Sequence, residues 1–255
     1  MSGRVQLSIE GALARVTLSH PGKFNAMSRG MWRELKTVFA QLQTRADLRC
    51  VVVSGEGGHF CAGGDIAEYP GFRFDAEQLR DFHENDVWGG LSAMLACDLP
   101  VLAQIEGNCM GAGVEIASCC DIRVAAVGAQ FGAPIARLGF PMAPREAQLV
   151  AQEAGLATAR EMLFEAAVFD APQMQTRGFL NAVLPEAEVA ADVMARAQRI
   201  ARLASQAARL NKQTLRQLRT GQPVQAIVAH AYDYADEAEH REGIAAFLGK
   251  RQPVF

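Results

Sequence analysis

Two short apolar runs, each followed directly by a glycine-rich loop, constrain the fold of this chain more than any other feature. The first run covers residues 50–53 and leads into a loop that holds five glycines between residues 55 and 64. The second covers residues 101–105 and leads, through glycines at 107, 111 and 113, into an apolar helix. Short apolar runs bounded by turn residues are typical of buried strands. The succession of strand, glycine-rich loop and helix therefore predicts an α/β fold.

The first half of the chain holds further strands. Residues 5–9 and 14–18 alternate apolar and polar side chains, which predicts a hairpin. Ser28 is placed to cap a helix. The apolar side chains of that helix recur at helical spacing, at Met31, Leu35, Val38, Phe39 and Leu42. Residues 122–127 and 129–131 are two more expected strands.

After about residue 145 the pattern is helical almost without interruption. Helices are expected within residues 145–166, 171–177, 187–219 and 223–248, which are rich in Ala, Leu, Arg and Gln. These segments are too slim to enclose a second core, so we expect them to cover the first part or a neighbouring subunit. We divide the chain into residues 1–190, a core that holds the site, and residues 191–255, a helical region of the same overall domain.

Composition excludes several classes of protein. The chain has 255 residues, of which 50% are hydrophobic and 21% charged, as in an ordered globular domain. A formal net charge of −3 argues against a general nucleic-acid binder. No stretch approaches about 20 apolar residues, and none resembles a signal peptide, so we expect no membrane association. The six cysteines include no CxxC pair, which predicts reduced thiols in a cytoplasmic protein.

The glycine-rich loops are not nucleotide-binding loops. A dinucleotide fingerprint would need glycine where Phe60 stands, and the chain has no Gly-Lys-Ser/Thr for a phosphate loop. Glycine at 111 and 113 lets a ligand approach the backbone, and the helix that follows leaves its first N–H groups unpaired. A single loop of this kind is also what a tight turn needs. Two of them after two strands indicate converging backbone donors, an oxyanion hole.

With these residues, the chain resembles the crotonase (enoyl-CoA hydratase/isomerase) superfamily. Residues 59–65 (HFCAGGD) are similar to the first oxyanion loop of that family, and residues 107–115 (GNCMGAGVE) are similar to the second. Residues 21–27 and 242–251 also match, in order, so the likeness covers nearly the whole chain. The resemblance implies the ClpP/crotonase fold, a superhelix of ββα turns with two nearly perpendicular sheets, followed by a helical C-terminal region that drives trimer formation.

The resemblance also assigns roles to residues. The two hole donors would be the backbone N–H groups of Gly64 and Ala112, binding the thioester carbonyl of an acyl-CoA. Several positions match the family's substrate contacts: Lys23, Phe24, Ala26, Ala62, Asp65, Ile66, Gly111 and Ile135. Two more, Phe247 and Lys250, match residues that close over the nucleotide, in some members from a neighbouring subunit.

Glu115 is the expected catalytic acid/base. It lies three residues after Ala112, so both share one face of a helix, and its side chain leans toward the helix N-terminus. It also matches the first catalytic glutamate of the family's hydratases. A glutamate among Val114, Ile116 and Ala117 is costly to bury without a purpose. A structural, hydrogen-bonded acid is the alternative interpretation.

One departure from the family pattern concerns water activation. Family hydratases carry a second glutamate, and Ile135 stands at that position. Isoleucine can neither hold nor deprotonate water. Residues that could supply a substitute group are Glu146, Arg145, Arg137, His83 and Glu84, and the sequence favours none of them.

The resemblance implies an acyl-CoA enzyme that stabilises a thioester enolate, nominally an enoyl-CoA hydratase/isomerase. A single-base isomerase, lyase or decarboxylase of the same family is the alternative, because of Ile135. A catalytically inactive oligomer that binds CoA esters is a second alternative. We expect a homotrimer or homohexamer. We expect no metal and no cofactor apart from the coenzyme A of the substrate, since HExxH and paired CxxC motifs are missing.

Overall fold

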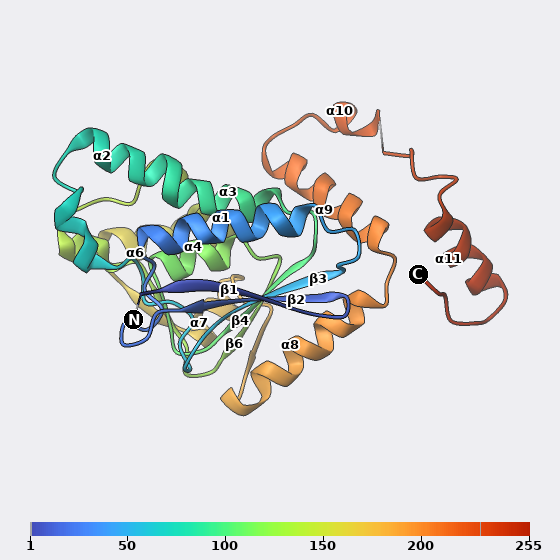
Figure 1. Cartoon of the computed structure of the whole chain (residues 1–255), viewed down its shortest axis with the longest axis horizontal. Coiled ribbons are helices and arrows are strands. Elements are labelled where there is room, and N and C mark those ends of the chain that lie inside the picture. Colours follow the sequence, from blue (N-terminus) through green and yellow to red (C-terminus); the bar gives the residue numbers. More distant parts are fainter. Residues whose placement is uncertain (1, 230) are drawn as a thin grey trace.

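The computed structural model describes residues 2–229 and 231–255, and its centre is a six-stranded sheet (Figure 1). In spatial order its strands are β1 (Arg4–Glu10), β2 (Leu13–Ser19), β3 (Cys50–Gly55), β4 (Val101–Ile105), β6 (Ile122–Ala126) and β9 (Ala182–Leu184). β1 and β2 form an antiparallel hairpin, and the other neighbouring pairs are parallel. The predicted hairpin and the two predicted buried strands are thus confirmed.

A second, smaller sheet lies beside the first. It consists of β5 (Asn108–Met110), β7 (Gln130–Gly132) and β8 (Val168–Asp170), in that order. Sequence patterns predicted β7 but not β5, β8 or β9. Each of these three strands is only three residues long, which is too short for an alternating pattern to stand out.

Helices cover both faces of the large sheet (Figure 1). α1 (Arg29–Gln43) packs with α3 (Trp88–Ala96) on one face, and α8 (Glu186–Ala201) lies on the other. Ser28 caps α1 as predicted, since its side chain accepts a hydrogen bond from the backbone N–H of Met31.

Alternate residues of β3 face two hydrophobic cores. Val51 and Val53 belong to the larger core under α1 and α3, whereas Cys50 and Val52 belong to the smaller core under α8. This arrangement explains why the run carries no polar residue. α8 runs across residue 190, so the smaller core joins the two parts into which we divided the chain.

Residues 66–96, to which sequence patterns assigned no element, form a helical segment, the second half of which packs against α1. It consists of η1 (Ile66–Gly71), α2 (Ala76–Asp81), a π-helical turn η2 (Phe82–Val87) and α3. η1 begins at Asp65, whose carboxylate accepts from the N–H of Ala67 at 3.3 Å. This helical segment forms one wall of the site described below.

The remaining helices follow the two glycine-rich loops. They are α4 (Ala112–Ser118), η3 (Pro134–Leu138), α5 (Pro144–Ala154), α6 (Leu156–Phe164), α7 (Ala171–Thr176), α9 (Ser205–Arg219), α10 (Val224–Val228) and α11 (Ala238–Leu248). Over the residues that the structure describes, no helix is long and apolar enough to cross a membrane.

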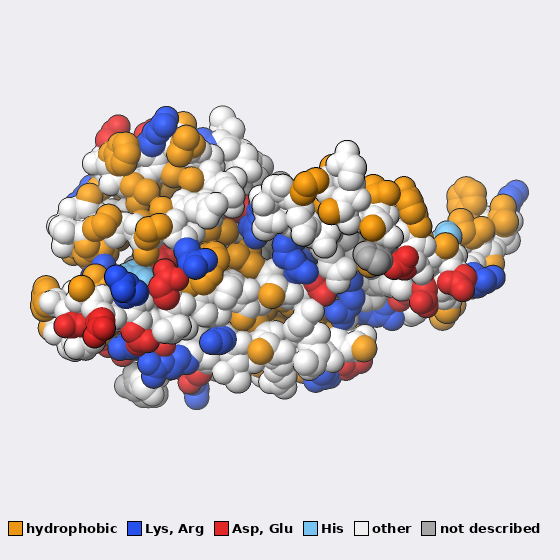
Figure 2. Space-filling view, turned by 90° about the horizontal axis from the view of Figure 1, so that it is seen from above, with side chains coloured by type: hydrophobic (Ala, Val, Ile, Leu, Met, Phe, Trp, Pro, Cys, Tyr) orange, Lys and Arg blue, Asp and Glu red, His pale blue; other side chains and the backbone are white. Residues whose placement is uncertain are grey.

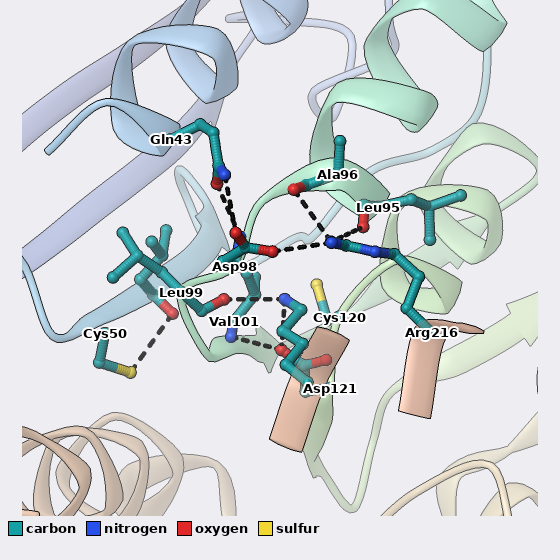
Figure 3. Close-up of polar contacts among 12 residues, drawn as sticks. Gln43, Cys50, Leu95, Ala96, Asp98, Leu99, Val101, Cys120, Asp121 and Arg216 are labelled. Carbon is teal, nitrogen blue, oxygen red and sulfur yellow. Dashed lines mark hydrogen bonds and ion pairs between the residues drawn. The ribbon is translucent and has the colours of Figure 1, made fainter. Parts of the chain in front are cut away.

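Ionic and polar contacts fix α9 onto the rest of the fold (Figure 3). The Arg216 guanidinium forms an ion pair of 2.8 Å with Asp98 and donates to two backbone carbonyls at the end of α3. On the same helix, Lys212 forms an ion pair of 2.7 Å with Asp121. Asp98 also accepts a hydrogen bond from the Gln43 amide at 2.9 Å. α9 is therefore held by charge rather than by a buried apolar face.

The C-terminal segment extends away from the two sheets, with α11 at the end of the molecule opposite α2 (Figure 1). Its exposed apolar side chains include Val224, Val228, Ile244, Phe247 and Leu248. Figure 2 shows hydrophobic side chains gathered on this extension. A surface of this kind is what a helical region would present if it covered a neighbouring subunit.

Candidate active site

The two glycine-rich loops lie side by side because they follow neighbouring parallel strands. β3 and β4 are adjacent, so their carboxyl ends meet at one edge of the sheet, where ligands bind in folds of this type. Two backbone hydrogen bonds join the loops. The N–H of Cys61 donates to the Asn108 carbonyl at 2.8 Å, and the N–H of Met110 donates to the Cys61 carbonyl at 2.9 Å.

Glycine is required where the loops touch. Gly63 and Gly111 both have positive φ angles, of 111° and 47°, which L side chains rarely adopt. At Gly113 the constraint is steric, since a Cβ atom there would lie 2.6 Å from the carbonyl oxygen of Cys61. Three glycines thus let the second loop pack directly on the backbone of the first.

The backbone N–H groups of Gly64 and Ala112 lie at this junction. Ala112 is the first residue of α4, where a helix leaves its N–H groups without intrahelical partners. The N–H of Gly64 donates to no backbone carbonyl within residues 2–229 and 231–255. Both residues line one cavity of about 230 Å³. The structure thus brings together the two donors that the sequence analysis paired.

The walls of this cavity are largely apolar. They include Trp32, Ile66, Phe82, Val87, Ile135, Leu138, Phe140 and Met142. These side chains come from α1, η1, η2 and the segment that joins β7 to α5. The cavity is smaller than the roughly 300–1,000 Å³ of pockets that take drug-sized ligands. Its size suits a short chain.

Glu115 lies on α4 one turn after Ala112 and reaches the same cavity. Only 7% of this residue is exposed. Burial raises the pKa of its carboxyl well above the ordinary value, and the nearby negative charge of Glu146 raises that pKa further. No described residue donates a hydrogen bond to this carboxyl, so the geometry does not favour the alternative of a structural, hydrogen-bonded acid.

A second carboxyl group enters the cavity from a different element. Glu146 stands in the first turn of α5, is 3% exposed, and lies 2.9 Å from Nδ1 of His83 on the π-helical turn η2. π-Helical turns occur frequently at functional sites. Both residues were among the five candidates for a group to replace the second glutamate.

The other three candidates lie outside the cavity. Arg145 and Glu84 form an exposed ion pair of 2.8 Å with each other. Arg137 donates to the backbone carbonyl of Ala166 at 3.3 Å. The sequence could not show which of the five candidates replaces the second glutamate. Arg145 and Glu146 are consecutive residues of α5 that point in different directions, and only the tertiary structure shows which of them faces the cavity.

Two cavity residues, Tyr69 and Arg73, were missed by sequence reasoning. The Tyr69 hydroxyl lies against Gly64, so closely that a Cβ atom at that position would collide with it. Burial raises the pKa of Tyr69 to about 12, which keeps the hydroxyl protonated. Arg73 packs beside Tyr69 and Phe140. The Pro70-Gly71 pair and the Asp65 cap signal a turn here, but nothing in the sequence signals that the turn lines a cavity.

The predicted substrate contacts near the first loop are also close together. Lys23 forms an ion pair of 2.6 Å with Asp65, which ties the segment before α1 to the start of η1. The N–H of Ala62 donates to the Phe24 carbonyl at 3.0 Å, and 56% of Phe24 is exposed. Ala26 is buried beneath them and donates to the Lys23 carbonyl. Of these residues, only Ala62 lines the cavity, and the others are linked to the first loop by these contacts.

Phe247 and Lys250 are not brought to the cavity within one chain. Phe247 belongs to α11, is 82% exposed, and lies at the far end of the molecule from the helices that wall the cavity (Figure 1). Lys250 follows two residues after α11. Phe247 and Lys250 could therefore contribute to a site only on a neighbouring subunit. Within the described ranges, no group of three or more His, Cys, Asp or Glu residues is placed to hold a metal ion.

Comparisons with known proteins agree over most of the chain. The family described as enoyl-CoA hydratase/isomerase matches residues 8–255. A probable enoyl-CoA hydratase of Rhodobacter capsulatus is 31% identical, over 98% of this chain and 97% of that protein. A probable enoyl-CoA hydratase of Mycobacterium bovis is 28% identical, over 94% and 93%. The crystal structure of an "enoyl-CoA hydratase/carnithine racemase" from Magnetospirillum magneticum superposes with a TM-score of 0.95 at 37% identity, over 98% of this chain and 94% of that one.

Proposed function

The chain belongs to the enoyl-CoA hydratase/isomerase family, and from this premise we propose that it acts on acyl-CoA thioesters through an enolate held between Gly64 and Ala112. The observation that carries the proposal is that the buried carboxyl of Glu115 lies in the same largely apolar cavity as two backbone N–H groups that have no partner among the described residues. This combination can polarise a thioester carbonyl and move a proton at the neighbouring carbon.

The two N–H groups would stabilise the charge that forms on the carbonyl oxygen. When a proton leaves C2 of the acyl chain, the electron pair of the C–H bond moves onto the thioester oxygen. Fixed donors aimed at that oxygen stabilise the enolate without reorganisation, and removing one such donor typically costs about 3–4 kcal/mol. The neutral hydroxyl of Tyr69, packed against Gly64, is available as a further donor beside this position.

Glu115 would move the proton. Its carboxyl shares a helix face with the Ala112 donor, so it can reach the carbon next to a carbonyl held there. A raised pKa brings a carboxyl closer to neutral pH, where proton transfer in both directions is most efficient. The alternative reaction by a single base, such as double-bond isomerisation, needs no more than this one group. It is favoured by Ile135, which lines the cavity where family hydratases have glutamate.

Glu146 supports hydration as the main proposal. Burial and the charge of Glu146 together raise the pKa of Glu115 and so favour its protonated form. In hydration the water oxygen bonds to C3 and one carboxylate takes a water proton, while the other carboxyl gives a proton to C2. The pair Glu115 and Glu146 offers both groups, with His83 holding the second. We therefore propose an enoyl-CoA hydratase whose second carboxyl comes from α5.

The coenzyme part of the substrate would lie over the first loop, along Lys23, Phe24, Ala62 and Ile66. The exposed apolar surface of the C-terminal helices supports a homotrimer or homohexamer, in which Phe247 and Lys250 of one copy would close over the nucleotide of another. We propose a cytoplasmic enzyme that needs no metal.

Turnover by a Glu115→Gln variant tests this function. We expect hydration of crotonyl-CoA, or isomerisation of a 3-enoyl-CoA, to fall by about 10²–10⁴-fold, because the amide keeps the shape of the side chain but cannot transfer a proton. Binding of butanoyl-CoA should stay within a few-fold. The matched control is Glu77→Gln, on the exposed surface of α2. A wild-type protein that binds CoA esters but turns over neither substrate would instead be the inactive CoA-ester-binding oligomer.

A further inference from the structure

Arg73 presents an unpaired cation to the cavity. Its guanidinium carbon lies 3.6 Å from the centre of the Phe140 ring and 4.5 Å from that of Tyr69. Arg73 lines the same cavity as Glu115. Its Nη1 atom is shielded from solvent and has no hydrogen-bond partner among the described residues.

The surrounding protein does not neutralise this group. A buried donor without a partner costs free energy, and a charged one costs more than a neutral one. Glu146 is close enough to act on Arg73 through its charge, but its carboxylate is engaged by His83. No carboxylate oxygen of the described residues lies within ion-pair distance of the Arg73 side chain. A guanidinium remains charged in proteins even where burial disfavours it, so the cavity holds a cation that needs an anion.

We propose that Arg73 binds a carboxylate on the acyl chain, so that the substrates are short acyl-CoA thioesters that carry a second acid group. This inference rests on the proposed function, since the thioester end is taken to lie in the Gly64 and Ala112 hole. It adds what that function leaves open, which is the chemistry of the far end of the acyl chain.

The aromatic contacts prepare Arg73 for this role. The guanidinium carbon lies over the rings of Phe140 and Tyr69, and no hydrogen bond among the described residues uses the side-chain N–H groups of Arg73. The N–H groups that reach the cavity therefore remain available to a carboxylate, with which arginine forms paired hydrogen bonds. The rings also fix the side chain, so little conformational entropy is lost on binding. A cavity of about 230 Å³ limits the distance between the hole and Arg73 to a short chain.

The same arrangement discriminates against plain fatty acyl chains. A methyl end placed against Arg73 would remove the remaining solvent from the cation without supplying an anion in its place. Sites built to hydrogen-bond a polar group reject analogues that lack it. Hydrogen bonds to charged groups contribute about 1.5–3 kcal/mol, which corresponds to a preference of about 10–100-fold in affinity.

Binding of matched thioester pairs tests the inference without any turnover. Each pair differs only in the end of the chain: glutaryl-CoA against pentanoyl-CoA, and adipoyl-CoA against hexanoyl-CoA. Dissociation constants are measured by calorimetry with the full-length protein, and free CoA is measured alongside. In wild type we expect one diacid thioester to bind at least about 10-fold more tightly than its partner. In Arg73→Met this preference should vanish while the affinity for the plain thioester stays within about 3-fold.

Two further variants make the result specific. Arg80→Met removes an exposed arginine from nearby α2 and should leave the preference unchanged. Arg73→Lys keeps the charge without the planar fork, and we expect it to retain part of the preference for the diacid thioester. If Arg73→Met fails to fold, the test is the preference of Arg73→Lys compared with that of wild type.

Equal affinities within both wild-type pairs would overturn the inference, as would a preference that survives in Arg73→Met. A loss of free CoA binding in Arg73→Met equal to its loss of thioester binding would also overturn it, because Arg73 would then contact the coenzyme. Each of these outcomes leaves the proposed enolate chemistry standing. Failure of the wild type to bind free CoA or any thioester would contradict the proposed function itself.

Discussion

The burial of Glu115 predicts that the residue lowers the stability of the fold at neutral pH. Folding raises the pKa of this carboxyl, so the native state holds the proton more tightly than the unfolded chain does. The free energy of unfolding should therefore decline as pH rises from the ordinary pKa of 4.5 toward the raised value, and stay low above it. Below the ordinary pKa, Glu115 is protonated in both states and this effect disappears.

Glu115→Gln removes the ionisation and should relieve the cost. Each pH unit by which folding raises the pKa corresponds to about 1.4 kcal/mol, or about 3–5 °C in melting temperature for a chain of this size. The variant should therefore be more stable than wild type at pH 7–8, although it is inactive. This opposition of stability and activity is typical of buried catalytic groups.

Urea unfolding of both proteins at pH 4, 5, 6, 7 and 8, at one protein concentration, measures the effect. The difference in unfolding free energy between Glu115→Gln and wild type should be small at pH 4 and widen as pH rises. Glu77→Gln, at an exposed position, should show no such widening. A difference that is constant from pH 4 to pH 8 would refute the reasoning, because the Glu115 carboxylate would then not be desolvated by folding.

Two further predictions concern the neighbours of Glu115. Gly64→Ala should lower kcat by at least about 10-fold, because the added Cβ collides with the Tyr69 hydroxyl and displaces the hole. Adding Tyr69→Phe to this variant should recover part of the rate. A double variant no faster than Gly64→Ala would show that the clash is not the cause. Glu146→Gln should lower the rate of crotonyl-CoA hydration by about 10²-fold or more while leaving 3-enoyl-CoA isomerisation less affected. Equal losses in both assays would contradict a role specific to water. His83→Asn should lower the hydration rate by less than Glu146→Gln does.

The central elements of the fold could be predicted from sequence because each carries a recognisable local pattern. The run at residues 50–53 is wholly apolar because both of its faces are buried under helices. Ser28 caps α1 through its own side chain, which is a property of neighbouring residues alone. The strands β5, β8 and β9 were missed because three residues carry too little pattern, and they exist through pairing with distant partners.

The site could be predicted only in part, for a related physical reason. Gly64 lies in the first glycine-rich loop, and Ala112 and Glu115 begin the helix after the second; the glycine spacing of both loops is visible in the sequence, and the structure brings the three residues together. Glu146 and Arg73 reach the cavity only because α5 and the helical segment of residues 66–96 pack around it. Their inward orientation depends on tertiary packing, to which no local motif corresponds.

The measurement that tests the central claim most directly is exchange of the C2 protons of a saturated thioester. Pentanoyl-CoA is incubated with the protein in D₂O, and loss of the C2 proton signal is followed by NMR. If Glu115 removes this proton while the hole formed by Gly64 and Ala112 holds the enolate, wild type should catalyse the exchange and Glu115→Gln should be slower by about 10²-fold or more. Exchange by Glu115→Gln at the wild-type rate would contradict the account.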